Sequence, residues 1–362
     1  MRRVAAAVVV AVVVGLAGCS GGDDDDDERA VPAGDTTTTS TTITTTSSSA
    51  DSSDSAGEPA PGPFVPQVEE FDVPRGSHPH DVAVSSDGIV WYTAQHTGKL
   101  GRLDPRTKKV DEVPLGNGSS PHGVIVGPDG APWVTDTGLN AIVRVDPVSR
   151  AVTRFNPPSE HGTVGMHTAV FDARGRLWFT GSAGFVGRLD PASRRMDVFR
   201  TPRGAGPYGI TAAPNGDVYY ANLAKHYLGK VDPETGAVTV VEPPTRGQGT
   251  RRVWADSAGV IWSSQWDAGQ VAAYDPGSGR WKEWRLPGAA PKAYSVYVDY
   301  RDKVWLTDFG ANAIVRFDPA TEQFTTFRNP STPGNVRQQL GRPGEVWGAE
   351  SANDKLVVIR TG

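Results

Sequence analysis

Three histidines in this sequence stand at equivalent places, where each could transfer a proton or hold a ligand. His80, His122 and His167 each lie 11 residues before a tryptophan, and the chain contains seven histidines in all. A neutral imidazole near pH 7 can act as a general base, and it can also bind a ligand through hydrogen bonds. The fold must therefore be one that brings several equivalent positions of the chain together.

The tryptophan belongs to a repeat with a period of 41 to 45 residues. Its seven positions hold Trp91, Trp133, Trp178, Tyr219, Trp262, Trp305 and Trp347. Each unit contains short alternating apolar segments separated by turn residues, and such a period is typical of the four-stranded blades of a β-propeller. The sequence therefore predicts an all-β chain that folds as a seven-bladed β-propeller of four-stranded blades.

The seventh repeat stops early, at LVVIRTG, and it lacks a fourth strand. The segment VEEFDVP at residues 68–74 resembles a fourth strand that precedes the first repeat. If the N-terminal strand completes the last blade, the ring closes and an exposed sheet edge disappears. We therefore expect the propeller to span residues 67–362, with its last blade closed by the N-terminal strand.

The slot 11 residues before the aromatic begins the innermost strand, so its side chains should surround the central channel at one mouth. In the seventh repeat the spacing is 10, and the seven residues are His80, His122, His167, Tyr208, Arg251, Tyr294 and Arg337. Inheritance from one ancestral blade would explain three histidines, but it would not explain tyrosine and arginine in the same slot. Tyrosine and arginine are frequent anchors of binding sites, so we expect a small-molecule or peptide ligand here. A second slot, three residues past the aromatic, includes Asp136 and should face the same mouth.

The N-terminal residues differ in composition from the repeats. Residues 1–18 have the basic start and apolar core of a secretion signal, and they end in LAGC, which resembles the lipobox of bacterial lipoproteins. That resemblance implies a lipid on Cys19, the one cysteine of the chain. Residues 19–66 are rich in Asp, Ser, Thr and Pro, a composition that predicts a disordered stalk. We therefore expect a bacterial protein that is exported and lipid-anchored to the outer face of the cell membrane.

The formal net charge of −5 comes from the acidic residues of the stalk, and the repeats are nearly neutral. A nucleic-acid-binding domain would show a basic patch, so we expect no nucleic-acid partner. We expect a monomer.

The stretch SPHGVIVGPDGAPWVTDTGLNAIVRVDP, residues 120–147, resembles the repeats of the streptogramin B lyase family, also called virginiamycin B lyases. The resemblance extends over residues 67–362 and implies a carbon–oxygen lyase. In that family a histidine removes the proton next to an ester carbonyl, and a magnesium ion held by two glutamates stabilises the enolate. The cyclic depsipeptide is thereby opened by elimination.

On this resemblance His122 matches the base, and His80 matches the substrate-binding histidine of the preceding blade. Ser120 replaces one metal-binding glutamate, and Asp136 is a shorter match to the other. The resemblance thus implies a magnesium ion with Asp136 as its ligand, although one carboxylate is missing. Three hypotheses remain open: a lyase-like enzyme, a non-catalytic propeller that binds a glycan, peptide or envelope partner, and another metal-dependent enzyme such as a lactonase.

Overall fold

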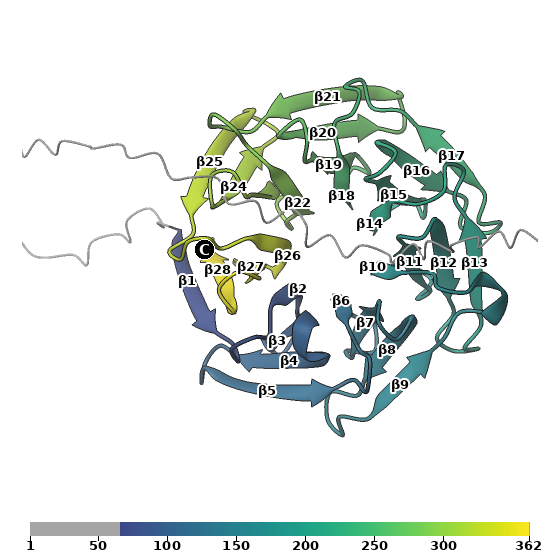
Figure 1. Cartoon of the computed structure of the whole chain (residues 1–362). Helices are drawn as coiled ribbons and strands as arrows, with labels where there is room; N and C mark the ends of the chain where they lie inside the picture. The colour runs from purple at the N-terminus through teal and green to yellow at the C-terminus, as the bar shows by residue number, and fades with distance from the viewer. Residues whose placement is uncertain (1–65, 362) are drawn as a thin grey trace, which may run out of the picture. The chain divides into compact units, whose positions relative to one another are not determined.

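A computed structural model describes residues 66–361 of the chain. They form seven four-stranded antiparallel sheets arranged in a ring, and each sheet has one innermost strand that lies nearest the axis (Figure 1). The predicted seven-bladed propeller is confirmed. The leader, the stalk and Cys19 lie outside the described residues. Within the described part, no helix is long and apolar enough to cross a membrane.

The strands follow the repeat from blade to blade. Blade 1 contains β2 (Pro79–Val84), β3 (Val90–Ala94), β4 (Lys99–Asp104) and β5 (Lys109–Pro114). Blade 2 contains β6 (Pro121–Val126), β7 (Pro132–Asp136), β8 (Ala141–Val145) and β9 (Val152–Phe155). Blade 3 contains β10 (Met166–Phe171), β11 (Leu177–Gly181), β12 (Phe185–Leu189) and β13 (Met196–Arg200). Blade 4 contains β14 (Pro207–Ala212), β15 (Val218–Asn222), β16 (Tyr227–Val231) and β17 (Val238–Val241).

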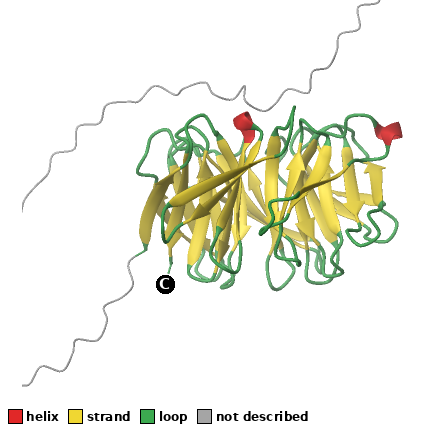
Figure 2. Cartoon of the chain, turned by 90° about the horizontal axis from the view of Figure 1, so that it is seen from below, coloured by secondary structure: helices red, strands yellow, loops and turns green. Residues whose placement is uncertain are grey.

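The remaining blades continue this order. Blade 5 contains β18 (Thr250–Ala255), β19 (Ile261–Gln265), β20 (Gln270–Asp275) and β21 (Arg280–Arg285). Blade 6 contains β22 (Ala293–Val298), β23 (Val304–Asp308), β24 (Ala313–Asp318) and β25 (Gln323–Arg328). Blade 7 contains β26 (Val336–Arg342), β27 (Glu345–Glu350), β28 (Lys355–Arg360) and β1 (Gln67–Asp72). Two short 3-10 helices, η2 (Gln95–Thr97) and η3 (Ser159–His161), lie on the same face of the propeller (Figure 2).

The last blade is closed by the first strand, as the sequence predicts. β1 pairs antiparallel with β28, with Val68 opposite Ile359 and Phe71 opposite Leu356. Phe71 then packs on Trp347 of β27, with 5.3 Å between the ring centroids. This pairing gives the apolar β28 a neighbour on each side and leaves the more polar β1 as the outer edge.

The innermost strand of each blade contains an irregularity near its start. In β2 the register with β3 shifts between Pro79 and Val82, and equivalent shifts occur in the other six blades. A bulge of this kind re-aims side chains, because it interrupts the strict alternation of a strand. Two consecutive residues, His80 and Asp81 in blade 1, can therefore both contribute to the channel.

In blades 1, 2, 3, 5 and 6, a hydroxyl group on the second strand holds the bulge in place. Thr93 Oγ1 accepts a hydrogen bond from the backbone N–H of Asp81 (2.9 Å) and donates to the carbonyl oxygen of His122 in the next blade (2.8 Å). Thr135, Thr180 and Ser264 donate in the same way to the next blade. These hydroxyl groups fix the position of one ring residue relative to the next.

The aromatic of each repeat packs between blades and, in most blades, is also hydrogen-bonded. The indole N–H of Trp178 donates to Asp172 at 2.9 Å, and that of Trp305 donates to Asp299 at 2.8 Å. Trp91 is different: Ser85 stands six residues before it, where the other two tryptophans have an aspartate, and the indole N–H has no partner among the described residues. A buried N–H group without a partner costs stability.

Candidate functional site

Four of the seven predicted ring residues form a continuous row of side chains whose rings lie close together and are tilted against one another. The ring centroids of His80 and His122 are 3.9 Å apart, those of His122 and His167 are 3.8 Å apart, and those of His167 and Tyr208 are 3.8 Å apart. All four side chains are less than a tenth exposed. The structure therefore brings together residues from four consecutive blades at the axis of the propeller.

The other three ring residues complete the circle. The hydroxyl groups of Tyr208 and Tyr294 are 2.8 Å apart, and the guanidinium group of Arg251 lies 3.9 Å from the centre of the Tyr294 ring. Arg251 also donates a hydrogen bond to the Tyr208 hydroxyl (2.9 Å), and Arg337 donates through Nε to Ser351 (2.9 Å). All seven predicted ring positions thus converge on the channel.

The bulge adds a second layer of side chains that the sequence analysis missed. Arg252 donates to Asp81 at 3.0 Å and to Thr168 at 2.8 Å, so that blades 1, 3 and 5 are joined across the axis. Arg252 is 3% exposed and Asp81 is 1% exposed. Asp81 also contacts Nδ1 of His80 at 2.8 Å. This buried ion pair spans the channel directly beside the histidines.

The three ring histidines are neutral near pH 7. Burial lowers the pKa of His80 well below its usual value, and the positive charges of Arg337 and Arg252 lower it further. The pKa values of His122 and His167 are lowered for the same first reason. Nδ1 of His122 lies 3.0 Å from the carbonyl oxygen of His167, which can only accept, so Nδ1 carries the hydrogen and Nε2 keeps its lone pair.

The same positive charges also lower the pKa of Tyr294. Its burial alone would raise its pKa, but the nearby guanidinium groups of Arg251, Arg337 and Arg252 outweigh this effect and lower the pKa of Tyr294 to about 8. The positive potential at the centre of the ring therefore favours a negative charge on an oxygen atom at this place.

Asp136 serves as a loop cap in the structure. Its Oδ1 accepts hydrogen bonds from the backbone N–H groups of Ser120 (3.0 Å) and Leu139 (2.9 Å), and its Oδ2 accepts one from the Ser119 hydroxyl (2.5 Å). Asp308 occupies the same slot of blade 6 and accepts three backbone N–H groups. The seven residues of this second slot are all buried, as the ring residues are: Ala94, Asp136, Gly181, Asn222, Gln265, Asp308 and Glu350.

The donor atoms near the ring do not fit a magnesium ion. His80, Asp81 and His122 have potential ligand atoms within 4.8 Å of one another. Two of these three donors are imidazole nitrogens, whereas magnesium prefers oxygen ligands and usually keeps several waters. The third donor, Asp81, already contacts the Arg252 guanidinium, and a cation bound beside that guanidinium would be repelled.

Two aromatic residues at the mouth were not predicted. Trp266 and Phe309 each follow the second slot of their blade, and both are partly exposed. Phe309 stacks on Tyr294 with 4.7 Å between centroids and an angle of 4° between the rings, and Trp266 lies 5.4 Å from Phe309. Large aromatic residues directly after a second-slot position are a sequence signal that could have identified them.

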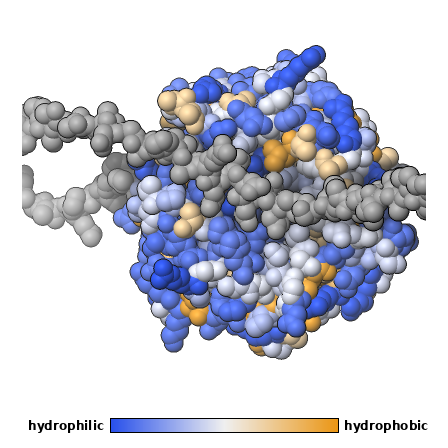
Figure 3. Space-filling view, in the orientation of Figure 1, coloured by the Kyte–Doolittle hydropathy of each residue, from blue (hydrophilic) through white to orange (hydrophobic). Residues whose placement is uncertain are grey.

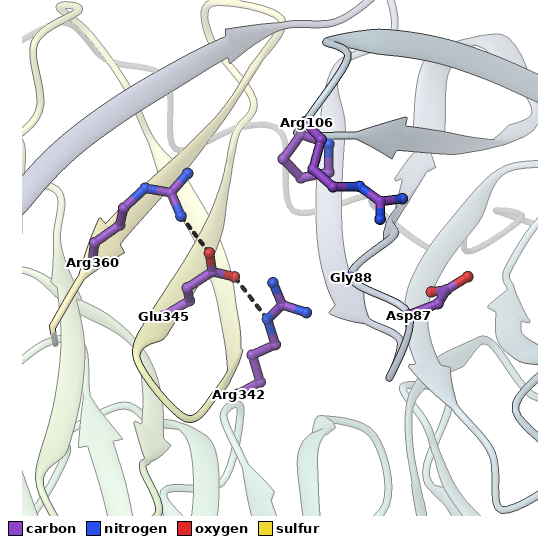
Figure 4. A pocket seen from close by; sticks show the side chains of 7 residues that line it. Asp87, Gly88, Arg106, Arg342, Glu345 and Arg360 are labelled. Carbon is purple, nitrogen blue, oxygen red and sulfur yellow. Dashed lines mark hydrogen bonds and ion pairs between the residues drawn. The ribbon is translucent and has the colours of Figure 1, made fainter.

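A separate pocket of about 280 Å³ lies between blades 1 and 7, at the end of the propeller away from the ring (Figure 4). Glu345 pairs there with both Arg342 and Arg360, and Arg106 pairs with Asp104. Positive and negative groups are thus paired in this pocket.

The comparisons with known proteins agree with the propeller fold. The family model described as the virginiamycin B lyase family matches residues 66–358. A virginiamycin B lyase from Staphylococcus aureus is similar in structure, with a TM-score of 0.76, 18% identity, and coverage of 82% of this chain and all of that chain. A streptogramin B lyase has a TM-score of 0.75 at 20% identity, over 82% of this chain and 98% of that one.

Propellers with other roles are also similar. The structure titled "YCF48 bound to D1 peptide" has a TM-score of 0.65 at 14% identity, and it covers 82% of this chain and 96% of that one. A comparison with curated proteins finds no match. Structural likeness at such low identity concerns the fold, whereas the family model covers most of the sequence. The chain belongs to the virginiamycin B lyase family.

Proposed function

We propose that this protein is a ligand-binding propeller, and that it holds a small molecule with carbonyl or carboxylate oxygens at the channel ring. The observation that carries the proposal is the convergence of Tyr208, Arg251, Tyr294 and Arg337 at the axis, with phenol and guanidinium groups in mutual contact. These groups donate hydrogen bonds to oxygen acceptors, and guanidinium groups suit carboxylates in particular.

The structure supports metal-assisted elimination less well than it supports ligand binding. Ser120 cannot supply the charged oxygen that the family's glutamate provides, and both oxygens of Asp136 already accept hydrogen bonds. A base works best when its pKa lies near the working pH, and the pKa of His122 is well below that range. The part of the face that is visible in Figure 3 is mostly hydrophilic, with hydrophobic residues in separate small areas.

The test uses the full chain and a streptogramin B depsipeptide, with and without magnesium. We expect calorimetry to detect binding that is lost in Arg337→Gln, and mass spectrometry to find no ring-opened product. Magnesium-dependent ring opening by the wild-type chain would overturn the proposal, and so would the absence of any binding.

Metal-free elimination is the second candidate function, because the tautomer of His122 leaves Nε2 free to take a proton. The proton would leave the carbon next to a carbonyl, its electron pair would form a carbon–carbon double bond, and the ester oxygen would depart as a carboxylate. Loss of a positioned base costs about 10²–10⁴-fold in rate, so His122→Ala should abolish any product seen without magnesium. Product formation that His122→Ala leaves unchanged would reject His122 as the base.

We also propose that the protein is exported and anchored by a lipid on Cys19, with the ring facing ligands outside the cell. The sequence LAGC supports this location. Cys19→Ala should move the protein from the detergent-rich phase to the aqueous phase, or leave its leader uncleaved. Unchanged partitioning of the variant would contradict a lipid at this position, because two or more acyl chains anchor a protein firmly.

A further inference from the structure

The loop between β5 and β6 contains one of the two Asn-Gly pairs of the chain. Asn117 and Gly118 form the pair in this loop, and Asn215 and Gly216 form the other pair, in the turn between β14 and β15. In such a pair the backbone nitrogen of the glycine can attack the side-chain carbon of the asparagine, because glycine has no Cβ to shield its nitrogen. The surroundings of each pair decide whether it can react.

The pair in the β5–β6 loop is not held by hydrogen bonds. Asn117 and Gly118 are both exposed. In the described part of the chain, neither the Asn117 side chain nor the backbone N–H of Gly118 makes a hydrogen bond. Gly118 has a φ of +77°, and nothing lies within 4 Å of the place where its Cβ would stand. The Asn117 side chain can therefore rotate toward the Gly118 nitrogen without breaking a hydrogen bond.

The second pair is also near the surface, but its reacting groups are hydrogen-bonded. The backbone N–H of Gly216 donates to the carbonyl oxygen of Ala213 at 2.9 Å. Oδ1 of Asn215 accepts a hydrogen bond from the backbone N–H of Asp217 (3.0 Å), and Nδ2 of Asn215 donates to the Asp217 carboxylate (3.0 Å). These three hydrogen bonds must break before Asn215 can react, so the turn protects it.

We infer that Asn117 is a site of spontaneous modification, at which the asparagine is converted to isoaspartate. The nitrogen of Gly118 forms a bond to Cγ of Asn117, and Nδ2 takes the N–H proton of Gly118 and leaves as ammonia. A water molecule then opens the resulting succinimide ring. Opening at the main-chain carbonyl gives isoaspartate, in which the chain continues through Cβ and Cγ and a new carboxylate remains, whereas opening at Cγ gives aspartate. The reaction needs no cofactor and does not depend on which ligand the ring binds.

The modified bond lies in a loop that supports the ring. The backbone N–H of Ser120 donates to Oδ1 of Asp136 at 3.0 Å. The carbonyl oxygen of Gly118 is packed against Gly138, where a Cβ would lie only 2.1 Å from it. Isoaspartate adds one backbone atom directly before this packed segment, and β6 with His122 begins directly after it. Conversion should therefore release Ser120 from Asp136 and displace the start of β6.

The modification is tested by peptide mapping of the full chain after ageing in mildly alkaline buffer. We expect the peptide with Asn117 to lose ammonia and gain water, and an isoaspartate-specific methyltransferase to label it. The peptide with Asn215 should react at least about tenfold more slowly, because each hydrogen bond that must break lowers the population of the reactive form several-fold. Equal rates at the two sites, or no conversion at Asn117, would overturn the inference.

A sugar on Asn117 of the exported protein would also overturn it. The residues Asn-Gly-Ser at 117–119 match the acceptor pattern for N-glycosylation. A glycan on Nδ2 would block the loss of ammonia. The same peptide map distinguishes the two modifications, because a glycan adds a large mass and the conversion adds a very small one.

Three variants separate the reaction from its consequence. Asn117→Gln keeps an amide but needs a larger ring to react, so it should stay unmodified. Asn215→Gln is the matched control and should leave the conversion of Asn117 unchanged. Freshly prepared Asn117→Asp carries the new charge without the additional backbone atom.

Hydrogen exchange reports on the displacement of the loop. Exchange in the peptide that contains Ser120 should become about fivefold faster in the converted wild-type chain, which corresponds to the loss of one hydrogen bond, and it should stay unchanged in fresh Asn117→Asp. Unchanged exchange in a fully converted chain would refute the displacement of β6. Equally fast exchange in fresh Asn117→Asp would show that the charge, and not the additional backbone atom, displaces the loop.

Discussion

Glu350 should lower the stability of the propeller at neutral pH. It ends β27, is 0% exposed, and lies close to Glu70 of the closing strand and Lys355 of β28. Burial, together with the negative charge of Glu70, raises the pKa of Glu350 from 4.5 to about 8. Glu70 stays an acceptor, because its two oxygens accept hydrogen bonds from Ser331. Glutamine resembles the protonated acid, so Glu350→Gln removes the titration and keeps a donor toward Glu70.

The expected magnitude follows from the two pKa values. Below pH 4.5 the carboxyl group of Glu350 is protonated in both the folded and the unfolded chain, and it does not affect the free energy of unfolding. Between pH 4.5 and about 8 the unfolded chain alone loses this proton, so the wild-type free energy of unfolding falls by about 1.4 kcal/mol per pH unit. At pH 7.5 the upper bound is about 4 kcal/mol, and we expect Glu350→Gln to be more stable than the wild type by about 2–4 kcal/mol.

The assay is urea unfolding of both chains at a series of pH values from 4 to 9, analysed as the difference between them. The difference should be near zero at pH 4, grow through pH 7 and level off above about pH 8. Glu160→Gln, at an exposed carboxyl group on η3, is the control and should show no such growth. A difference that is constant with pH, or a variant less stable than the wild type at pH 7.5, would refute the burial argument.

Two further predictions concern the turn of blade 1 and the channel ion pair. Ser85→Asp combined with Asp87→Ala copies the Asp-Ser-Ala-Gly turn of blade 5 and gives the Trp91 indole an acceptor, so thermal unfolding should show about 1–2 kcal/mol of added stability; an unchanged melting temperature would contradict this. Arg252→Met should destabilise the fold by about 3–5 kcal/mol because it leaves Asp81 buried without its ion pair, whereas Arg252→Met with Asp81→Leu should cost less in urea unfolding. A double variant as unstable as the single one would show that the cost lies in packing.

The repeat was sufficient to predict the fold and the ring. The spacing of the tryptophans gave the number of blades, and the shortened seventh repeat indicated closure by the N-terminal strand. The slot of His80 was found by offset alone, since equivalent positions of a propeller meet at the axis. The repeat period predicts the fold well here, because each blade packs against its neighbours in the same way.

The second layer of the site could not be predicted in this way. Strict alternation along a strand would turn Arg252 away from the channel, and only the bulge in β18 brings it beside Asp81. The role of Asp136 could not be predicted either. A carboxylate at the end of a strand can bind a metal or cap a loop, and the sequence pattern is the same in both cases. The backbone N–H groups of the following turn decide between these roles.

Closure of the ring by β1 has a consequence for how the chain folds as it is made. Glu69 of β1 and its partner Arg360 are 291 residues apart. At a typical synthesis rate of about 5–20 residues per second, β1 waits about 15–60 s for the strand that it pairs with. During that interval the last blade cannot form, and the completed blades form an open arc.

The order of the two strands suits this delay. β1 has the sequence QVEEFD, whose three acidic residues keep it soluble while it is unpaired, whereas β28 contains the apolar run LVVI and emerges last. An apolar strand that waited for its partner would be a site for aggregation, and a charged strand resists it. The direction of synthesis therefore exposes the charged edge early and the apolar strand only when both of its neighbours are present.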